Sequence, residues 1–264
     1  MAAKIFNEFK ENLKKGFPVA LATVIEGPGQ GAKLLLLPDG SYLGSLGNTK
    51  IDNVLSRDMA GELAAGRTSI RHYGIEGEAR EETLSIFIES FAPPPQMVIF
   101  GAVDFTAALV RIAKVLGYKV IVCDARPVFA TKARFPQADS VENEWPDQLM
   151  EKLGTSLGPR DAVCVLTHDN KFDVPAITSA LQTQVGYIGV MGSRKTHENR
   201  TERLIEAGVT TKEFERVMSP IGLDLGARTP EETAISICAE IIAMRTGRKA
   251  PHLKTIEGAI HGDR

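Results

Sequence analysis

The spacing of hydrophobic positions divides the chain into two regions that meet at three consecutive prolines, residues 93–95. Before them, the apolar runs are typical of strands joined by turns, with two helices added. After them, short and wholly apolar runs take turns with stretches of helical spacing. Three prolines favour an extended backbone and cannot continue a helix or a central strand. The sequence therefore predicts a domain boundary at this point.

The first region, residues 1–92, is predicted to be a small α+β domain. An amphipathic helix is expected over residues 1–16, with one apolar stripe formed by Ile5, Phe6, Phe9 and Leu13. Strands are expected at 17–26, 34–37, 42–46, 68–73 and 83–90. Asp39-Gly40 supplies a turn between the second and third of these strands. Asn48 is the expected N-cap of a second helix, whose apolar face carries Ile51, Leu55, Met59 and Leu63.

The second region, residues 97–264, alternates predicted strands with predicted helices. Strands are expected at 97–100, 119–123, 161–166 and 185–190, and helices at 105–116, 173–182, 194–207 and 230–245. The last helix has the clearest signals, because Thr229 is a suitable N-cap, Pro230 follows it and Glu232 completes a capping box. Such alternation implies right-handed βαβ units and a Rossmann-like parallel sheet covered on both faces.

Composition and charge narrow the functional classes. The chain has 264 residues, of which 43% are hydrophobic and 24% charged, so it can build a real core. With 31 basic and 33 acidic residues the net charge is -2, which gives no electrostatic reason to expect nucleic acid or an anionic membrane as partner. No apolar run approaches a membrane span or a signal peptide. Three isolated cysteines within apolar runs indicate buried, reduced thiols, and we expect a cytoplasmic protein.

The turn after the first strand of the second region is a candidate nucleotide site. Gly101 lies between a strand and a helix, where a dinucleotide-binding fold places its glycine-rich turn. Asp124 ends the next strand and could accept hydrogen bonds from ribose hydroxyls. However, Val103 stands at the second glycine position and Asp104 adds a negative charge nearby. A Rossmann-like scaffold without bound dinucleotide therefore stays an open alternative.

Two further loops follow predicted strands. His168 comes directly after the strand at 161–166 and could donate a proton, orient a ligand or bind a metal, or only hold its loop. Gly192 and Ser193 precede a helix whose first turn carries Arg194 and Lys195. Cations oppose the dipole at a helix N-terminus, so an anion bound between them and the amide groups is expected. His197 and Arg200 could join this patch; two solvated surface cations are the alternative.

The fourth candidate is the glycine-rich stretch at 219–229. Gly222 and Gly226 bracket Asp224, and the loop leads into the last helix, so its amide groups could form an anion nest. Arg228 would then pair with a phosphate. Spacing alone gives no Ser-His-Asp or Cys-His set and no metal-binding motif. The glutamates of the last helix are explained as capping residues.

Taken together, these stretches resemble the xanthine dehydrogenase accessory-protein family of the XdhC/CoxI type. The resemblance covers residues 97–247 strongly and 1–92 weakly, and its signatures are DARPVFATKARFPQAD (124–139), VLTHDNKFDVPAI (165–177), GYIGVMGSRKTHENR (186–200) and SPIGLDLGARTPEETAISICAEIIA (219–243). The family implies a small N-terminal domain joined to a Rossmann domain. It also implies an accessory protein that binds molybdenum cofactor, protects it and hands it to an apo-molybdenum hydroxylase.

The resemblance carries further expectations about partners and ligands. It implies a homodimer, a client of the xanthine dehydrogenase type and a cysteine desulfurase as a further partner. The cofactor is an oxidation-prone pterin with a phosphate, which would use the loops at 192–194 and 222–228. This chain is a divergent member, since residues 44–50 lack the cysteine of the family's Gly-Gly-Cys-type motif and Val103-Asp104 replace its usual Gly-His.

Two other functions stay open from the sequence. The first is an NAD(P)- or nucleotide-dependent oxidoreductase that uses the cleft beside Gly101, Asp124 and His168. The second is a non-catalytic regulatory protein that has kept the fold and lost the ligand. Binding of NAD(P) that weakens on Asp124→Ala would favour the first of these alternatives.

Overall fold

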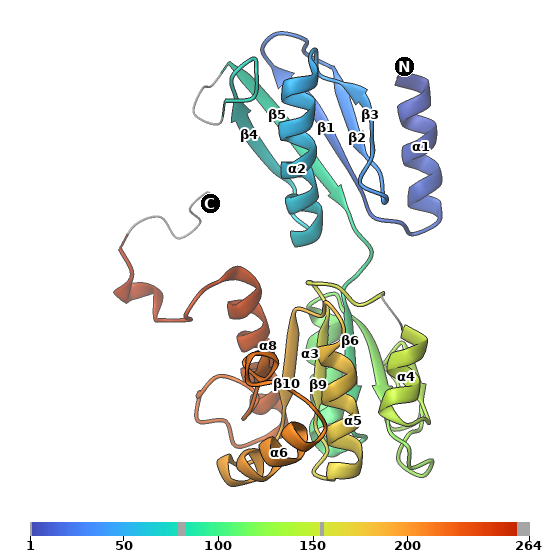
Figure 1. Ribbon diagram of the computed structural model, residues 1–264, viewed down its shortest axis with the longest axis vertical. Coiled ribbons are helices and arrows are strands. Elements are labelled where there is room, and N and C mark those ends of the chain that lie inside the picture. The colour runs from blue at the N-terminus through green and yellow to red at the C-terminus, as the bar shows by residue number, and fades with distance from the viewer. Residues whose placement is uncertain (1, 79–82, 154–155, 258–264) are drawn as a thin grey trace. The chain divides into compact units, whose positions relative to one another are not determined.

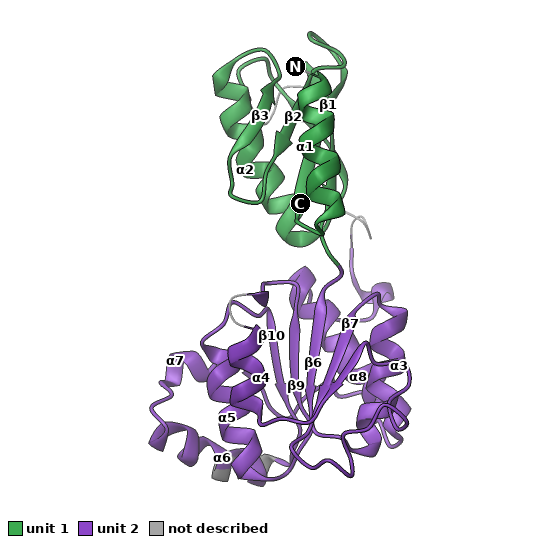
Figure 2. Ribbon diagram, turned by 90° about the vertical axis from the view of Figure 1, so that its right-hand side faces the viewer, with its two compact units in different colours: residues 1–93 green, residues 94–264 purple. Residues whose placement is uncertain are grey.

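The structure, a computed structural model, describes residues 2–78, 83–153 and 156–257 of the chain. It divides into two compact units, residues 1–93 and residues 94–264, coloured separately in Figure 2. Each unit has its own sheet and its own hydrophobic core.

Unit 1 is built on a five-stranded antiparallel sheet with the strand order β3-β2-β1-β5-β4. The strands are β1 (Val19–Glu26), β2 (Lys33–Leu36), β3 (Tyr42–Ser45), β4 (Ser69–Tyr73) and β5 (Leu84–Phe91). The predicted turn between β2 and β3 is present: Gly40 has a φ of 82°, and Asp39 accepts a hydrogen bond from the Ser41 amide at 3.0 Å. This geometry suits glycine because a positive φ is costly for other residues.

The two helices of unit 1 cover opposite faces of its sheet. In β1, Ala20 and Ala22 belong to the hydrophobic core on the face covered by α2 (Thr49–Ala65). Val19 belongs to the smaller apolar cluster on the other face, which includes Ile5 of α1 (Ala2–Lys14). This follows from the two-residue period of a strand. The predicted stripe of α1 is only partly correct, since Ile5 is buried but Phe6 and Leu13 are exposed.

Unit 2 is built on a six-stranded sheet in which every neighbouring pair is parallel. The strands are β6 (Gln96–Phe100), β7 (Lys119–Cys123), β8 (Ser140–Glu142), β9 (Ala162–Val165), β10 (Tyr187–Val190) and β11 (Val217–Met218). Their order is β11-β10-β9-β6-β7-β8, which is the doubly wound order of a Rossmann fold. The order reverses between β6 and β9, and this switch point is where such sheets bind ligands.

Helices cover both faces of this sheet, as Figures 1 and 2 show. On one face, α3 (Asp104–Val115) and α8 (Pro230–Thr246) pack together over the core. The other face carries α4 (Pro146–Leu153) and α5 (Asn170–Leu181), with α6 (Arg194–Glu206) packed against α5 and the four-residue α7 (Thr211–Phe214) after it. The predicted fold class is confirmed. The short elements α4, α7, β8 and β11 were not among the expected ones.

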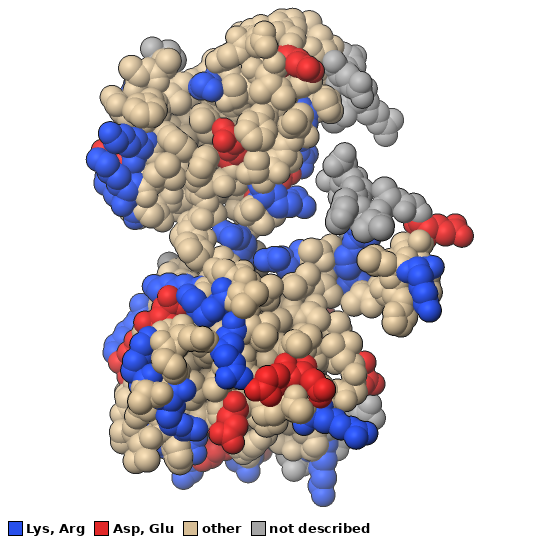
Figure 3. All heavy atoms as spheres, turned by 180° about the vertical axis from the view of Figure 1, so that it is seen from behind, with Lys and Arg blue, Asp and Glu red and all other residues tan. Residues whose placement is uncertain are grey.

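The surface charges of unit 2 are mixed in sign (Figure 3), in line with the near-zero net charge of the chain, and the three cysteines are buried. On the face drawn in Figure 3, basic and acidic side chains are interspersed over unit 2. The cysteines Cys123, Cys164 and Cys238 are buried and free, and burial raises the pKa of Cys123 and of Cys238 to about 12. Among the described residues, no helix is long and apolar enough to cross a bilayer.

Candidate functional site

The predicted site residues lie in loops that follow strands of the parallel sheet, apart from Arg194, which is the first residue of the helix after one of these loops. Gly101 follows β6, Asp124 follows β7 and His168 follows β9. The loop with Gly192 follows β10, and the loop with Gly222 follows β11. Because the strands are parallel, their carboxyl ends share one edge of the sheet. The fold therefore gathers at one edge loops that are up to 127 positions apart between Gly101 and Arg228.

At the switch point, the turn after β6 packs tightly against the start of the loop after β9. Gly101 has a φ of 111°, and a Cβ atom there would lie 2.7 Å from Thr167 Cγ2 and 3.1 Å from the Thr167 amide nitrogen. The buried Thr106 hydroxyl donates to the Gly101 carbonyl oxygen from the first turn of α3. Only glycine fits this contact, which holds the β6 and β9 loops together.

Asp124 is already engaged by the protein. Its Oδ2 accepts from the Ala102 amide at 2.8 Å and from Arg126 Nη2 at 2.8 Å, and its Oδ1 accepts from Arg126 Nε at 2.9 Å and from the Arg126 amide at 3.0 Å. Burial acts to raise the pKa of this carboxyl, but these hydrogen bonds outweigh burial and lower it. A ribose would have to displace Arg126 to reach Asp124. The geometry thus gives no support to the dinucleotide alternative.

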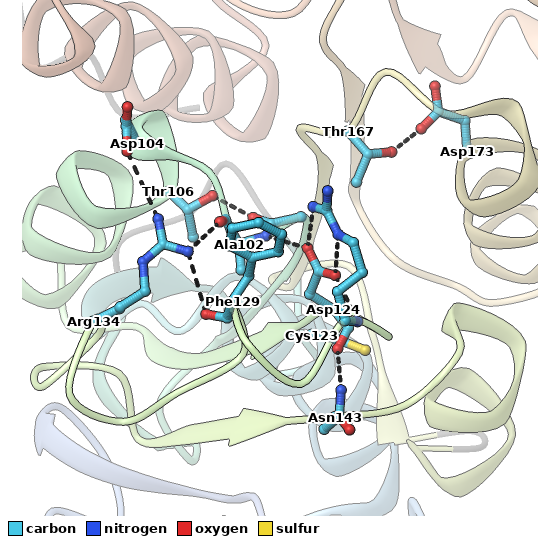
Figure 4. Close-up of polar contacts among 12 residues, drawn as sticks. Ala102, Asp104, Thr106, Cys123, Asp124, Phe129, Arg134, Asn143, Thr167 and Asp173 are labelled. Atoms are coloured by element: carbon cyan, nitrogen blue, oxygen red, sulfur yellow. Dashed lines mark hydrogen bonds and ion pairs between the residues drawn. The ribbon is translucent and has the colours of Figure 1, made fainter.

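The start of α3 differs from a nucleotide-binding turn at the two positions that the sequence singles out, Val103 and Asp104. Val103 is the N-cap residue and makes no side-chain capping bond. The Asp104 side chain is 91% exposed, and Arg134 Nη2 lies 3.7 Å from its Oδ1 (Figure 4). Arg134 therefore offsets the negative charge that Asp104 brings to this turn.

A buried ion pair links the β9 loop to the β10 loop. Arg200 of α6 donates to Asp173 Oδ2 of α5 through Nη2 at 2.8 Å and Nε at 3.1 Å. Asp173 Oδ1 accepts from the Thr167 hydroxyl, and Arg200 Nη2 also donates to the Met191 carbonyl at 3.0 Å. Burial raises the pKa of Asp173 despite these partners. The expectation that Arg200 joins a surface anion patch is wrong, because its guanidinium faces this buried carboxylate.

The remaining residues of these two loops are capping or exposed residues. Asp169 caps α5 by accepting from the Lys171 amide, and Ser193 caps α6 by accepting from the Thr196 amide. His168 is exposed between the strand and that cap. The helix begins at Arg194 as expected, but the Arg194 side chain lies outside the described residues.

The glycine-rich stretch at 219–229 is held by internal carboxylates. The Gly222 amide donates to Glu240 Oε2 at 2.9 Å, and the Arg228 amide donates to Glu232 Oε2 at 2.7 Å. These two amides are consequently not free for an anion nest. Asp224, Gly226 and the Arg228 side chain are exposed. What this loop offers a ligand is the Arg228 guanidinium rather than a complete ring of amides.

The glutamates of α8 do more than cap the helix, so that part of the sequence interpretation is wrong for two of them. Glu232 completes the predicted capping box with Thr229. Glu240, however, accepts at the same Oε2 atom from the Tyr187 hydroxyl at 2.5 Å and from the Gly222 amide. Glu231 pairs with Arg111 of α3 at 2.7 Å.

Several residues that shape this edge were not identified as site residues from the sequence. Arg126 and Arg134 were visible as parts of the signature at 124–139, and Asp173 as part of the signature at 165–177. Some of their contacts join distant segments, such as Arg134 with Ala102 and Asp173 with Arg200, and no local pattern encodes these contacts. Within the described residues, no group of three or more His, Cys, Asp or Glu side chains could hold a metal ion.

Comparison with family models matches both regions of the chain. The model of the XdhC Rossmann domain matches residues 97–241, and the model of the XdhC and CoxI family matches residues 13–74. Together they extend over parts of both compact units.

Known proteins with similar sequences include a probable xanthine dehydrogenase subunit of Bacillus subtilis (strain 168), which is 36% identical over 165 residues. That alignment covers 62% of this chain and 47% of the relative. The molybdenum cofactor insertion chaperone PaoD of Escherichia coli (strain K12) is 25% identical over 162 residues, covering 61% of this chain and 44% of PaoD. The chain thus spans about half the length of the curated relatives it matches.

A solved structure shares the fold. The crystal structure of a xanthine dehydrogenase from Bacillus halodurans superimposes with a TM-score of 0.55 at 22% sequence identity. The match covers 93% of this chain and 97% of that one.

Proposed function

The chain belongs to the XdhC and CoxI family, and from that premise we propose that it binds molybdenum cofactor and delivers it to an apo-molybdenum hydroxylase of the xanthine dehydrogenase type. The names of its relatives support an accessory role in maturation, since one is a molybdenum cofactor insertion chaperone and another is a probable subunit of a xanthine dehydrogenase. In this proposal the chain is a carrier, with no turnover of its own.

The observation that supports the proposal most is the contact between Gly101 and Thr167 at the switch point of the sheet. Ligands of open α/β sheets bind outside the carboxyl ends of the strands, at the point where the order reverses. A pterin that carries a phosphate needs cationic donors at such a site and protection from solvent. His168 and Arg228 are exposed in loops at this edge, and Lys195 is exposed in the first turn of α6, which follows the loop after β10.

The direct test is retention of the cofactor. Purified full-length chain would be mixed with freshly released molybdenum cofactor and passed through a desalting column, and the retained pterin would be quantified by fluorescence after oxidation. We expect about one equivalent per chain, with lower retention for Arg228→Ala and for Arg194→Ala. Arg248→Ala, an exposed arginine beyond the end of α8, is the matched control and should retain the cofactor.

A second measurement tests delivery. Loaded chain added to an apo-hydroxylase should restore activity faster than the same amount of free cofactor. Absence of retained pterin in the wild-type chain would contradict the proposal. Retention without transfer would restrict the role to storage of the cofactor.

A further inference from the structure

The segment that follows Asp124 places two arginines around one aromatic ring. The Cζ atom of Arg126 lies 4.5 Å from the centroid of the Phe129 ring, and that of Arg134 lies 5.4 Å from the same centroid. Figure 4 shows the Phe129 ring between Arg134 and Asp124. Cation–π contacts of this kind hold a guanidinium in place without neutralising its charge.

Both arginines are tied to the peptide groups of Ala102, the residue after Gly101. Arg134 Nη1 donates to the Ala102 carbonyl at 2.9 Å, and Arg126 binds the Asp124 carboxylate that accepts from the Ala102 amide. The two guanidinium groups are therefore fixed relative to the turn at the switch point. This fixation reduces the entropy that the side chains would lose on binding a ligand.

Each of the two guanidinium groups has nitrogen atoms that could donate hydrogen bonds to a ligand. Arg126 uses Nε and Nη2 on Asp124, and Arg134 uses Nη1 on the carbonyls of Ala102 and Phe129. Among the described residues, no hydrogen bond occupies Arg126 Nη1 or Arg134 Nε, and Arg134 Nη2 has only the 3.7 Å contact with Asp104. The two side chains are 47% and 35% exposed, so a ligand can reach them.

An apolar surface lies beside these donors. Phe129 is 40% exposed and Val128 is 78% exposed, although both are large hydrophobic residues. A planar ring system can lie against such a surface while its phosphate meets the guanidinium groups. Guanidinium groups bind phosphate with paired hydrogen bonds, and aromatic side chains add stacking energy for heterocyclic rings.

We propose that Arg126, Phe129 and Arg134 form a clamp that binds the phosphate of a planar heteroaromatic ligand beside the Gly101 turn. The pterin-phosphate of the molybdenum cofactor has this chemistry, and so does a flavin or adenine nucleotide. In naming the pterin as occupant the proposal rests on the carrier function proposed above. The chemistry of the clamp itself does not depend on that function.

The experiment uses the full chain with two probes. Flavin mononucleotide would be titrated by fluorescence, and molybdenum cofactor by the retention assay. Arg134→Met should weaken the binding of either ligand that the wild type takes up by tenfold or more, and Arg134→Lys should recover part of it. Arg248→Met is the matched control, since Arg248 is exposed and lies beyond the end of α8.

A second pair of variants separates binding from folding, because Arg134 also supports two backbone carbonyls. Val128 is exposed, so Val128→Glu and Val128→Lys should both fold with an unchanged Tm. The glutamate should repel phosphate and weaken binding several-fold, whereas the lysine should not. Inorganic pyrophosphate should compete with the bound probe in the wild type.

The outcomes distinguish the clamp from the carrier function. Pterin retention that none of the clamp variants lowers would overturn the clamp and leave the carrier function standing. Flavin mononucleotide binding that depends on Arg134, without pterin retention, would support the clamp and contradict the carrier function. If the wild type binds neither probe, both proposals are wrong.

Discussion

Arg200 and Asp173 form an ion pair in which both side chains are only 1% exposed. The pair joins α6 to α5, and through the Thr167 hydroxyl and the Met191 carbonyl it also joins the two loops that follow β9 and β10. The Nη1 atom of Arg200 is buried without a hydrogen-bond partner among the described residues. Burying a charge pair so completely gives little net stability. We infer that the pair fixes the relative position of the two loops.

Removing one partner of this pair should destabilise the protein strongly, because the other charge is left buried. We expect Arg200→Met and Asp173→Leu each to lower the free energy of unfolding by about 3 to 5 kcal/mol. The double variant should regain most of that stability. Its retention of molybdenum cofactor should still be lower than that of the wild type, because the two loops are no longer held in position. Urea unfolding and the retention assay measure the two effects. A double variant as unstable as the sum of the two singles would mean that the two side chains are not energetically coupled, and it would contradict this expectation.

The Asp124 carboxylate should contribute to stability in a defined pH range. Its pKa is lowered from an ordinary value of 3.8 by Arg126 and the Ala102 amide. A lowered pKa in the folded state means stability that is complete above the unfolded value and is lost as pH falls through the folded value. The difference in unfolding free energy between wild type and Asp124→Asn should stay constant from pH 7 to about 5 and shrink below about pH 4. A difference that grew on acidification would contradict this sign.

Gly101→Ala tests the contact at the switch point. A positive φ costs a non-glycine residue about 1 to 2 kcal/mol, and overlap with Thr167 adds about 1 to 3 kcal/mol. Gly117→Ala is the control, because Gly117 has a φ of 81° but nothing within 4 Å of an added Cβ. Thermal unfolding should show a clearly larger loss for Gly101→Ala. Equal losses of stability in the two variants would mean that the close contact between the β6 and β9 loops does not contribute to the cost of Gly101→Ala.

Glu240→Ala should loosen the loop after β11. Glu240 accepts from Tyr187 and from the Gly222 amide, and charge-assisted bonds contribute about 1.5 to 3 kcal/mol. Hydrogen exchange at Gly222 should become faster by one to two orders of magnitude. Glu231→Ala, which removes an exposed ion pair on the same helix, should leave that amide unchanged. Slow exchange in both variants would exclude Glu240 as the restraint on this loop.

Long, periodic elements were predictable from the sequence, and short ones were not. The start of α8 was predictable because Thr229, Pro230 and Glu232 are neighbours in the sequence and together favour a helix N-terminus. The structure shows the expected capping box. The strands β8 and β11 have three and two residues, too few for a periodic pattern. They exist because a neighbouring strand already offers hydrogen-bonding groups, which is a property of the assembled sheet.

The sequence by itself determined the Rossmann-like class, the order of its longer strands and helices along the chain, and the four loops in which polar and glycine residues gather. These features depend on local spacing and on short-range capping. Only the tertiary structure decided which groups those loops leave free. Asp124 is engaged by Ala102 and Arg126, and the Gly222 amide by Glu240. Arg126 is a neighbour of Asp124 in the sequence, but Ala102 and Glu240 lie 22 and 18 positions from the groups that they bind. Packing sets such partners, because a buried polar group takes whichever partner the fold brings within hydrogen-bond distance.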